Sequence, residues 1–273
     1  MIKSILAVSE GGPDAQMAYR LAGELGATYG AAIEAVHYPT SIRNVAAGMI
    51  DGLSGTVVGW DQRNIEARGE ASAAAFAAEL ASKPNTTYVS VDRQDPDDLL
   101  TRARTTDLMI AGRPGADPDN ESPESVSVAL HESACPVIVA PPSGSLGALG
   151  EAVIAWNGSQ QAARAVRFAL PLLKNARSVT IVVVGASEKP VATGRIKGWL
   201  GHHGIAAELA SIDPGAASAR ARGRAVLGFT HDRGASLLVM GAYGQAGVME
   251  FLGLGGATAK IISGCRVPVL LAH

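Results

Sequence analysis

Short apolar runs alternate with longer amphipathic stretches along the whole chain of 273 residues. The stretch 160–174 shows the helical period, because apolar side chains recur on one of its faces. These side chains are Ala163, Val166, Leu170 and Leu173. Buried strands that alternate with amphipathic helices form right-handed βαβ units around a parallel sheet. The pattern therefore predicts an α/β fold.

The pattern also predicts where the elements lie. In the first half we expect strands near 2–8, 32–37, 86–91, 107–112 and 136–140, and helices near 13–27, 61–82, 95–105 and 123–132. In the second half we expect strands near 151–156, 178–184, 205–211, 236–241 and 267–272, and helices near 159–174, 189–202, 216–233 and 256–264. Consecutive prolines at 141–142 cannot continue a central strand and mark a linker.

Three pairs of segments indicate that the chain contains two copies of one unit. The pairs are 5–8 with 153–156, 107–115 with 236–244, and 136–140 with 268–272. We therefore predict a first domain at 1–140, a linker at 141–150 and a second domain at 151–273. The first copy is about 19 residues longer between these landmarks. We place the surplus in 38–60, which we expect to be irregular and to cover a vacant pocket with side chains such as Leu53 and Trp60.

Composition and charge exclude several classes of function. The chain is 47% hydrophobic, but no apolar run is long enough to span a membrane. A net charge of −2 gives no reason to expect nucleic acid or an anionic membrane as a partner. The first eight residues resemble a strand and not a signal peptide, so we expect a cytoplasmic protein whose two cysteines, Cys135 and Cys265, are reduced and buried.

The best functional clue is a glycine-rich segment between two predicted strands. An apolar run ends at Gly241, Gly244 follows three residues later, and Gly255 and Gly256 precede a predicted helix. Glycines let the backbone approach an anion closely, and the N–H groups at a helix N-terminus supply partial positive charge. The segment indicates either a phosphate site or a tight turn before a helix with nothing bound.

The spacing resembles the carboxy-terminal signature of nucleotide-binding universal stress proteins, which is G-x-x-G, nine residues and then G-[S/T]. Gly241 and Gly244 match its first part. Ten residues instead of nine precede Gly255, and Gly256 stands in place of the hydroxyl residue. Thr258 follows two residues later. The whole chain is similar to a tandem member of this family.

This resemblance implies two tandem flavodoxin-like (adenine nucleotide α-hydrolase-like) domains. Each would be a five-stranded parallel sheet of order 3-2-1-4-5 with helices on both faces. Family members pair through their fifth strands, so the two domains would form an internal pseudo-dimer through 136–140 and 268–272, and a homodimer stays open as a further assembly. The resemblance also implies a cytoplasmic stress-response sensor or adaptor that binds an adenine nucleotide.

The resemblance places the ligand, ATP or AMP with or without Mg²⁺, in the second domain. Asn157 stands where many members have Asp. The expected nucleotide-binding residues are Ala155, Trp156, Asn157, Val183, Met240, Gly241, Gly244, Gly255, Gly256, Ala257 and Thr258. The segment 241–256 has no Lys or Arg, so main-chain N–H groups would hold the phosphates. A simpler interpretation of 157–159 is a helix N-cap made by Ser159.

The matching loop of the first domain differs in charge. Residues 116–124 carry four carboxylates and two prolines, which repel phosphate and remove N–H donors. We therefore do not expect nucleotide in this domain. The spacing of Asp117, Asp119 and Glu121 is loosely that of a calcium loop, but the later glycine and glutamate are missing, so a solvated acidic loop is the better interpretation.

Two other functions are left open. One is a ligand-free interaction protein that keeps the fold and has lost the pocket. The other is an enzyme, because 9–15 loosely resembles the S-G-G-x-D-S loop of ATP pyrophosphatases. No other catalytic motif is found, and we expect neither a catalytic residue nor a metal site. We therefore expect slow ATP hydrolysis at most.

Overall fold

The computed structural model describes residues 1–11, 15–38, 54–91, 96–113, 124–146, 148–185, 190–215, 218–242 and 257–273. The strands of the first half are β1 (Ser4–Ser9), β2 (Ala32–His37), β3 (Thr86–Ser90), β4 (Leu108–Gly112) and β5 (Val137–Ala140). Those of the second half are β6 (Glu151–Ala155), β7 (Ser178–Val184), β8 (Ala207–Ile212), β9 (Leu237–Gly241) and β10 (Val269–Ala272). The α/β class is confirmed.

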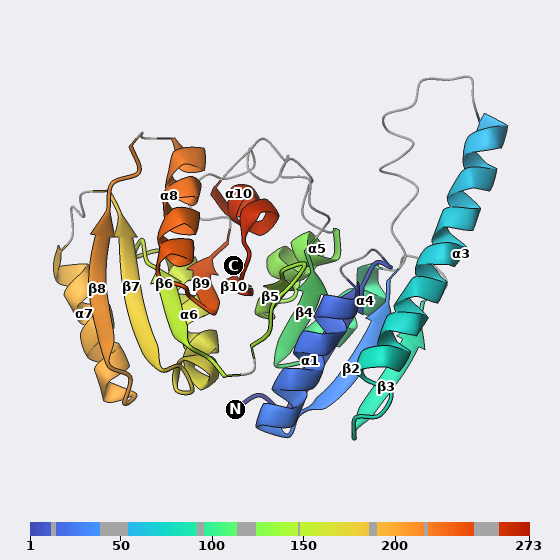
Figure 1. Ribbon diagram of the computed structural model, residues 1–273, viewed down its shortest axis with the longest axis horizontal. Coiled ribbons are helices and arrows are strands. Elements are labelled where there is room, and N and C mark those ends of the chain that lie inside the picture. Colours follow the sequence, from blue (N-terminus) through green and yellow to red (C-terminus); the bar gives the residue numbers. More distant parts are fainter. Residues whose placement is uncertain are drawn as a thin grey trace.

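All of these strands lie in a single ten-stranded sheet of order β3-β2-β1-β4-β5-β10-β9-β6-β7-β8 (Figure 1). Within each half the strands are parallel, and the order 3-2-1-4-5 occurs twice. The predicted class and order are therefore confirmed, and so is the predicted pairing of 136–140 with 268–272. The two five-stranded sheets are continuous, because β5 and β10 pair antiparallel with Ile138 opposite Leu270.

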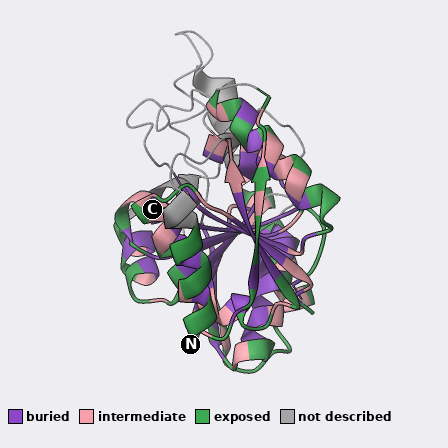
Figure 2. Cartoon of the chain, turned by 90° about the vertical axis from the view of Figure 1, so that its left-hand side faces the viewer, coloured by how far each residue is buried: buried purple, intermediate pink, exposed green. Residues whose placement is uncertain are grey.

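Helices cover both faces of this sheet. One face carries α1 (Ala15–Tyr29), α3 (Ser54–Glu79), α6 (Gln160–Leu173) and α7 (Pro190–His202). The other carries α4 (Pro96–Arg104), α5 (Glu124–Glu132), α8 (Ala219–Asp232) and α10 (Ala257–Gly264). Figure 2 shows the buried strands as a fan between these two helical layers. The strands of the central part are apolar along their whole length because both of their faces are covered.

Helix α3 corrects one expectation about the first half. It begins at Ser54, well before the expected residue 61, so 54–60 is regular helix and the expectation of an irregular segment is wrong there. The rest of the presumed surplus, 39–53, lies outside the described residues, as do the side chains of Leu53 and Trp60. Figure 1 shows α3 reaching past the end of the sheet. The apolar pattern of 54–60 is too irregular to reveal a helix.

Contacts between the halves extend beyond the central strand pair. The Tyr29 hydroxyl at the end of α1 donates to the Pro171 carbonyl of α6 at 3.0 Å, and the Asn175 amide donates to the same hydroxyl at 2.9 Å. The Glu24 carboxylate accepts from Ser145 Oγ and from the N–H of Leu146, which ties the connecting segment to α1.

Both cysteines are free and buried, as the sequence predicts. Burial raises the pKa of the Cys135 thiol to about 12 and that of the Cys265 thiol to about 11. Both thiols are therefore neutral at physiological pH. Within the described ranges, none of the helices has the length and apolar character needed to cross a membrane.

The central strand pair gives a first prediction. Leu270 of β10 is 1% exposed, so Leu270→Ala should lower the free energy of unfolding by about 2–5 kcal/mol through lost burial and a cavity. Leu209 on the outer strand β8 is 45% exposed, so Leu209→Ala should change it by less than about 0.5 kcal/mol. Urea unfolding of both variants measures the difference, and equal effects would contradict the packing described here.

Candidate functional site

The carboxyl ends of three neighbouring strands form the candidate site in the second half. Ala155, the last residue of β6, pairs with Val182 of β7 on one side and with Met240 of β9 on the other. The Trp156 N–H donates to the Val182 carbonyl at 2.9 Å and prolongs this edge. Met240 is buried, whereas Ala155, Trp156 and Val183 are half-buried. The structure thus brings four of the expected residues together.

The turn after β6 satisfies its polar groups locally. Asn157 is exposed, and its Oδ1 accepts the N–H of Ser159 at 3.0 Å. Gly158 has φ of +74°, a value that favours glycine. Ser159 Oγ accepts the N–H of Ala162 at 3.1 Å and caps α6. The N-cap interpretation is therefore confirmed.

Gly241 is required by packing at the end of β9. A Cβ at this position would lie 2.5 Å from the amide nitrogen of Ala162 and 2.7 Å from Cβ of Gln161, both in the first turn of α6. Only glycine allows the strand end and the helix start to approach this closely. Gly241 was expected to belong to an anion loop, but its packing explains the glycine without any ligand.

The first turn of α10 carries two further residues of the expected site. Ala257 is half-buried and Thr258 is buried. Gly223 of α8 lies against this turn, since a Cβ there would be 3.1 Å from the Ala257 carbonyl oxygen. The expected loop residues Gly244, Gly255 and Gly256 lie outside the described residues.

Three basic side chains that no sequence pattern predicted for the site lie near the end of β10. His273 Nδ1 is 3.2 Å from the Ala242 carbonyl oxygen, and Arg164 Nη1 donates to the main-chain oxygen of His273 at 2.8 Å. The ring of His131, from α5 of the first half, lies 4.7 Å from the His273 ring. Burial and the neighbouring His273 lower the pKa of His131. These three residues are far apart in the sequence, so no sequence pattern predicts that they meet.

The corresponding edge of the first half is covered by α3. Gly11 has φ of +78°, and a Cβ there would overlap the backbone of Arg68 in α3. The buried Ser9 accepts the Gly11 N–H through Oγ at 2.9 Å, and its carbonyl oxygen is 3.2 Å from Nδ1 of the buried His37. Helix α3 therefore lies directly on the turn after β1. Gly11, part of the motif that resembles a pyrophosphatase loop, packs against protein.

Comparison with solved structures identifies this architecture. A universal stress protein from Archaeoglobus fulgidus is similar with a TM-score of 0.67 and 16% identity, over 98% of this chain and 95% of that chain. A putative universal stress protein from Pseudomonas aeruginosa is similar with a TM-score of 0.57 and 13% identity, over 99% of this chain and 93% of that chain.

The fold is that of the universal stress proteins. The resemblance found in the sequence is therefore confirmed at the level of the fold. A third structure, a functionally unknown protein from Pseudomonas aeruginosa, is similar with a TM-score of 0.57 and 12% identity, over 99% of this chain and 92% of that one. No family model matches this chain, and no curated protein matches its sequence.

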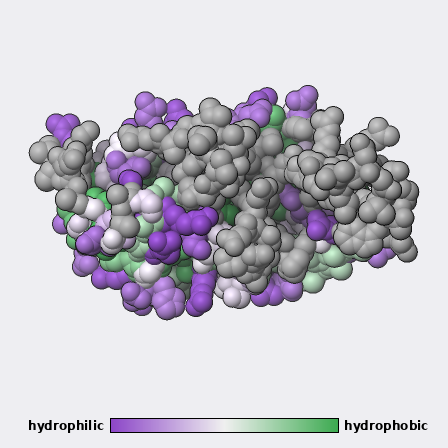
Figure 3. Space-filling model, turned by 90° about the horizontal axis from the view of Figure 1, so that it is seen from above, coloured by the Kyte–Doolittle hydropathy of each residue, from purple (hydrophilic) through white to green (hydrophobic). Residues whose placement is uncertain are grey.

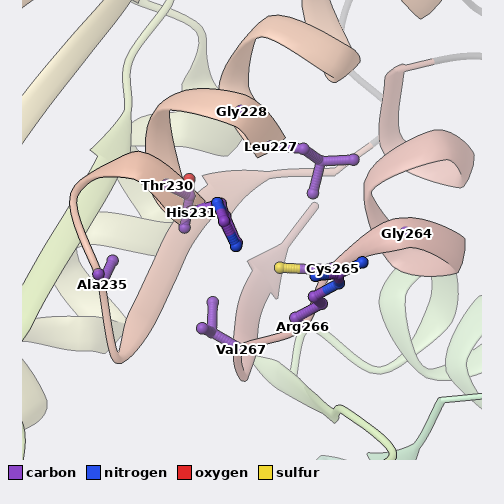
Figure 4. A pocket seen from close by; sticks show the side chains of 10 residues that line it. Leu227, Gly228, Thr230, His231, Ala235, Gly264, Cys265, Arg266 and Val267 are labelled. Carbon is purple, nitrogen blue, oxygen red and sulfur yellow. The ribbon is translucent and has the colours of Figure 1, made fainter.

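A cavity of about 570 Å³ lies at the end of the sheet opposite to the candidate site, between the C-terminal ends of α8 and α10. Figure 4 shows the side chains of Leu227, His231, Cys265, Arg266 and Val267 around it. None of the expected nucleotide-binding residues that the structure describes lines this cavity. Seen from above, the described surface intermixes hydrophilic and hydrophobic residues (Figure 3). Among the described residues, no group of three His, Cys, Asp or Glu side chains could hold a metal ion.

The packing of Gly241 gives a second prediction. Gly241→Val should lower the free energy of unfolding by roughly 1–3 kcal/mol, because its side chain would push the first turn of α6 away from β9. Gly228 in α8 is a matched control, since a Cβ there meets nothing within 4 Å. Gly228→Ala should leave stability unchanged or raise it by up to about 1 kcal/mol through helix propensity. Thermal unfolding compares the two, and a neutral Gly241→Val would contradict the close approach.

The covered edge of the first half gives a pH prediction. Burial, reinforced by the positive charge of Arg68, lowers the pKa of His37 below its usual 6.5. The unfolded chain therefore binds a proton that the folded chain excludes. The contribution of His37 to the free energy of unfolding is fully present above about pH 6.5 and is lost as the pH falls through the pKa of the folded state.

Chemical unfolding between about pH 7 and 5 measures this slope. His37→Asn should make it shallower because the proton uptake at this position is removed. His231→Asn serves as a control, because that side chain is 68% exposed. An unchanged slope in His37→Asn would show that the coupling of His37 to folding is wrong.

Proposed function

We propose that this chain is a universal stress protein of the tandem type that binds an adenine nucleotide, ATP or AMP, in its second half. The proposed units are 1–140 and 151–273, joined by 141–150. The chain would act in the cytoplasm as a stress-response sensor or adaptor, with slow hydrolysis at most. Mg²⁺ would accompany a triphosphate, since the sequence 241–256 offers no cationic side chain.

The observation that carries this proposal is the placement of Ala155 beside Met240. Strand β6 lies between β9 and β7 in the sheet. The chain continues from β6 to β7 and β8 on one side, and then crosses to β9 and β10 on the other side, so the winding direction changes between β6 and β9. Open parallel sheets bind ligands outside the carboxyl ends of strands at such a switch point. The glycine-rich sequence 241–256 connects this point to α10, whose N-terminus would face the phosphates.

The remaining parts of the ligand would follow from the same placement. Val183 and Ala155 would provide an apolar surface for the base, and Trp156 would close its edge. Asn157 could hydrogen-bond the sugar or base through the part of its amide that is not used in the Ser159 turn. Its neutral amide stands where many members have a carboxylate, so we expect a modest affinity.

A ligand-free interaction protein is the second candidate. Two observations favour it, because Gly241 is explained by packing against α6 and Asn157 by the turn that precedes that helix. Both residues would be retained in a chain that had lost its ligand. A binding measurement that separates the two candidates therefore needs a substitution in the loop and not at Gly241.

Gly244 provides that measurement. In the proposed site its main chain approaches the phosphates, so the side chain introduced by Gly244→Val should block binding and weaken affinity at least about tenfold. Gly115→Val is the matched control in the first half, whose acidic and proline-containing loop we do not expect to bind. Calorimetric titration with ATP and AMP, with and without Mg²⁺, compares both variants with the parent.

Each outcome of this titration is decisive. Loss in Gly244→Val with an unchanged Gly115→Val supports the site in the second half. Loss in Gly115→Val instead would move the site to the first half. A parent protein that binds neither nucleotide at millimolar concentration would make the ligand-free interaction protein the better conclusion.

A further inference from the structure

We infer that Arg113, a residue of the first half, is a positioning residue for the proposed nucleotide site of the second half. It would act by holding the C-terminal end of α10, the helix whose N-terminal end would face the phosphates. The inference rests on the proposed function and adds a dependence of that site on the other half of the chain.

Arg113 follows β4 and reaches across the boundary between the halves. Its N–H donates to the Ala140 carbonyl at 2.8 Å, which fixes its backbone beside β5. Its side chain is directed to the other half, where Nη1 donates to the Cys265 carbonyl oxygen at 3.0 Å. Cys265 is the residue directly after α10. The arginine is only 8% exposed, so its charge is largely removed from water.

The chemistry of this contact suits a helix C-terminus. The last carbonyl groups of a helix carry partial negative charge and lack partners within the helix, so a cation placed there is stabilising. Burial lowers the pKa of Arg113, but an arginine stays protonated at neutral pH, so the cation is retained. A buried charge–carbonyl contact is stronger than an exposed one because less water screens it.

Helix α10 needs such support because it is short. It has eight residues, fewer than an isolated helix needs to be stable in water. At the start of α10, its first turn packs against Gly223 of α8. At the end of α10, a Cβ on Gly264 would lie 3.0 Å from Leu227, which is also in α8. Arg113 adds the contact with the first half. Together these contacts decide where the N-terminal end of α10 points.

The repeat shows that this arrangement is asymmetric. Ala242 occupies the equivalent position in the second half, and its N–H donates to Ala272 at 2.8 Å just as Arg113 donates to Ala140. Alanine has no side chain that could reach across the boundary. The long cationic side chain therefore stands in the half whose own loop is acidic, and it supports the helix of the half with the glycine-rich loop.

A change in the orientation of α10 would change the measured affinity for nucleotide. If only a fraction of the molecules holds α10 in the binding orientation, the measured affinity falls by that fraction. Removing Arg113 leaves the Cys265 carbonyl without its cationic donor and should increase the displaced fraction. We expect the affinity for nucleotide to weaken about tenfold, because this factor corresponds to the free energy of one charge-assisted hydrogen bond.

The test uses the full chain and calorimetric titration with ATP and AMP. Arg113→Met removes the charge at similar length and should weaken binding about tenfold, whereas Arg113→Lys keeps a cation and should recover part of the affinity. Tyr29→Phe is the matched control, because it removes two hydrogen bonds between the halves on the opposite face of the sheet. It should leave the affinity unchanged even where it lowers thermal stability.

Hydrogen exchange of the α10 amides gives a second readout that needs no nucleotide. Exchange should be faster in Arg113→Met than in the parent and in Tyr29→Phe. If the parent binds nucleotide and Arg113→Met binds equally well, the inference is overturned. It is also overturned if Tyr29→Phe weakens binding as much as Arg113→Met, since any loosening of the halves would then suffice. A parent that binds no nucleotide removes the proposed function, and the exchange rates still decide whether Arg113 holds α10.

Discussion

The antiparallel pairing of β5 with β10 is the interaction on which the rest of the structure depends. Both strands have four residues and are buried over their whole length. Either strand alone would leave a row of unpaired main-chain groups at the edge of a sheet. Their pairing makes one continuous sheet and places the ends of α5 and α10 at the boundary between the halves. The contacts of Arg113 with Cys265 and of His131 with His273 both result from this placement.

Close packing at glycines is the second constraint. Gly241 lets β9 meet α6, and Gly223 lets α8 meet the start of α10. These two approaches fix the end of β9 and the start of α10, which carry expected site residues, before any ligand is considered. A glycine can therefore stand in a ligand-binding signature for a reason of packing.

The sequence predicted the fold well because the relevant signals are local. Apolar runs of strand length and the helical period in 160–174 gave the elements, whereas the strand order 3-2-1-4-5 came from the family resemblance. The resemblance added the pairing of the fifth strands, which no local pattern contains. The start of α3 was missed because 54–60 lacks a clear helical period. The contacts of Arg113, Arg164 and His273 could not be predicted, because their partners are distant in the sequence and meet only after the sheet has formed. The loop residues Gly244, Gly255 and Gly256 stay predictions.

The internal β5–β10 pair has a consequence for how such a protein can change over evolutionary time. When two identical subunits pair through one strand, every substitution occurs in both copies, so neither site can be altered alone. Here the partner strands belong to one polypeptide, and their local concentration does not depend on expression level or dilution. Each half is thus free to diverge while the other supplies its missing edge. Such freedom permits the contrast between an acidic loop in one half and a glycine-rich loop in the other.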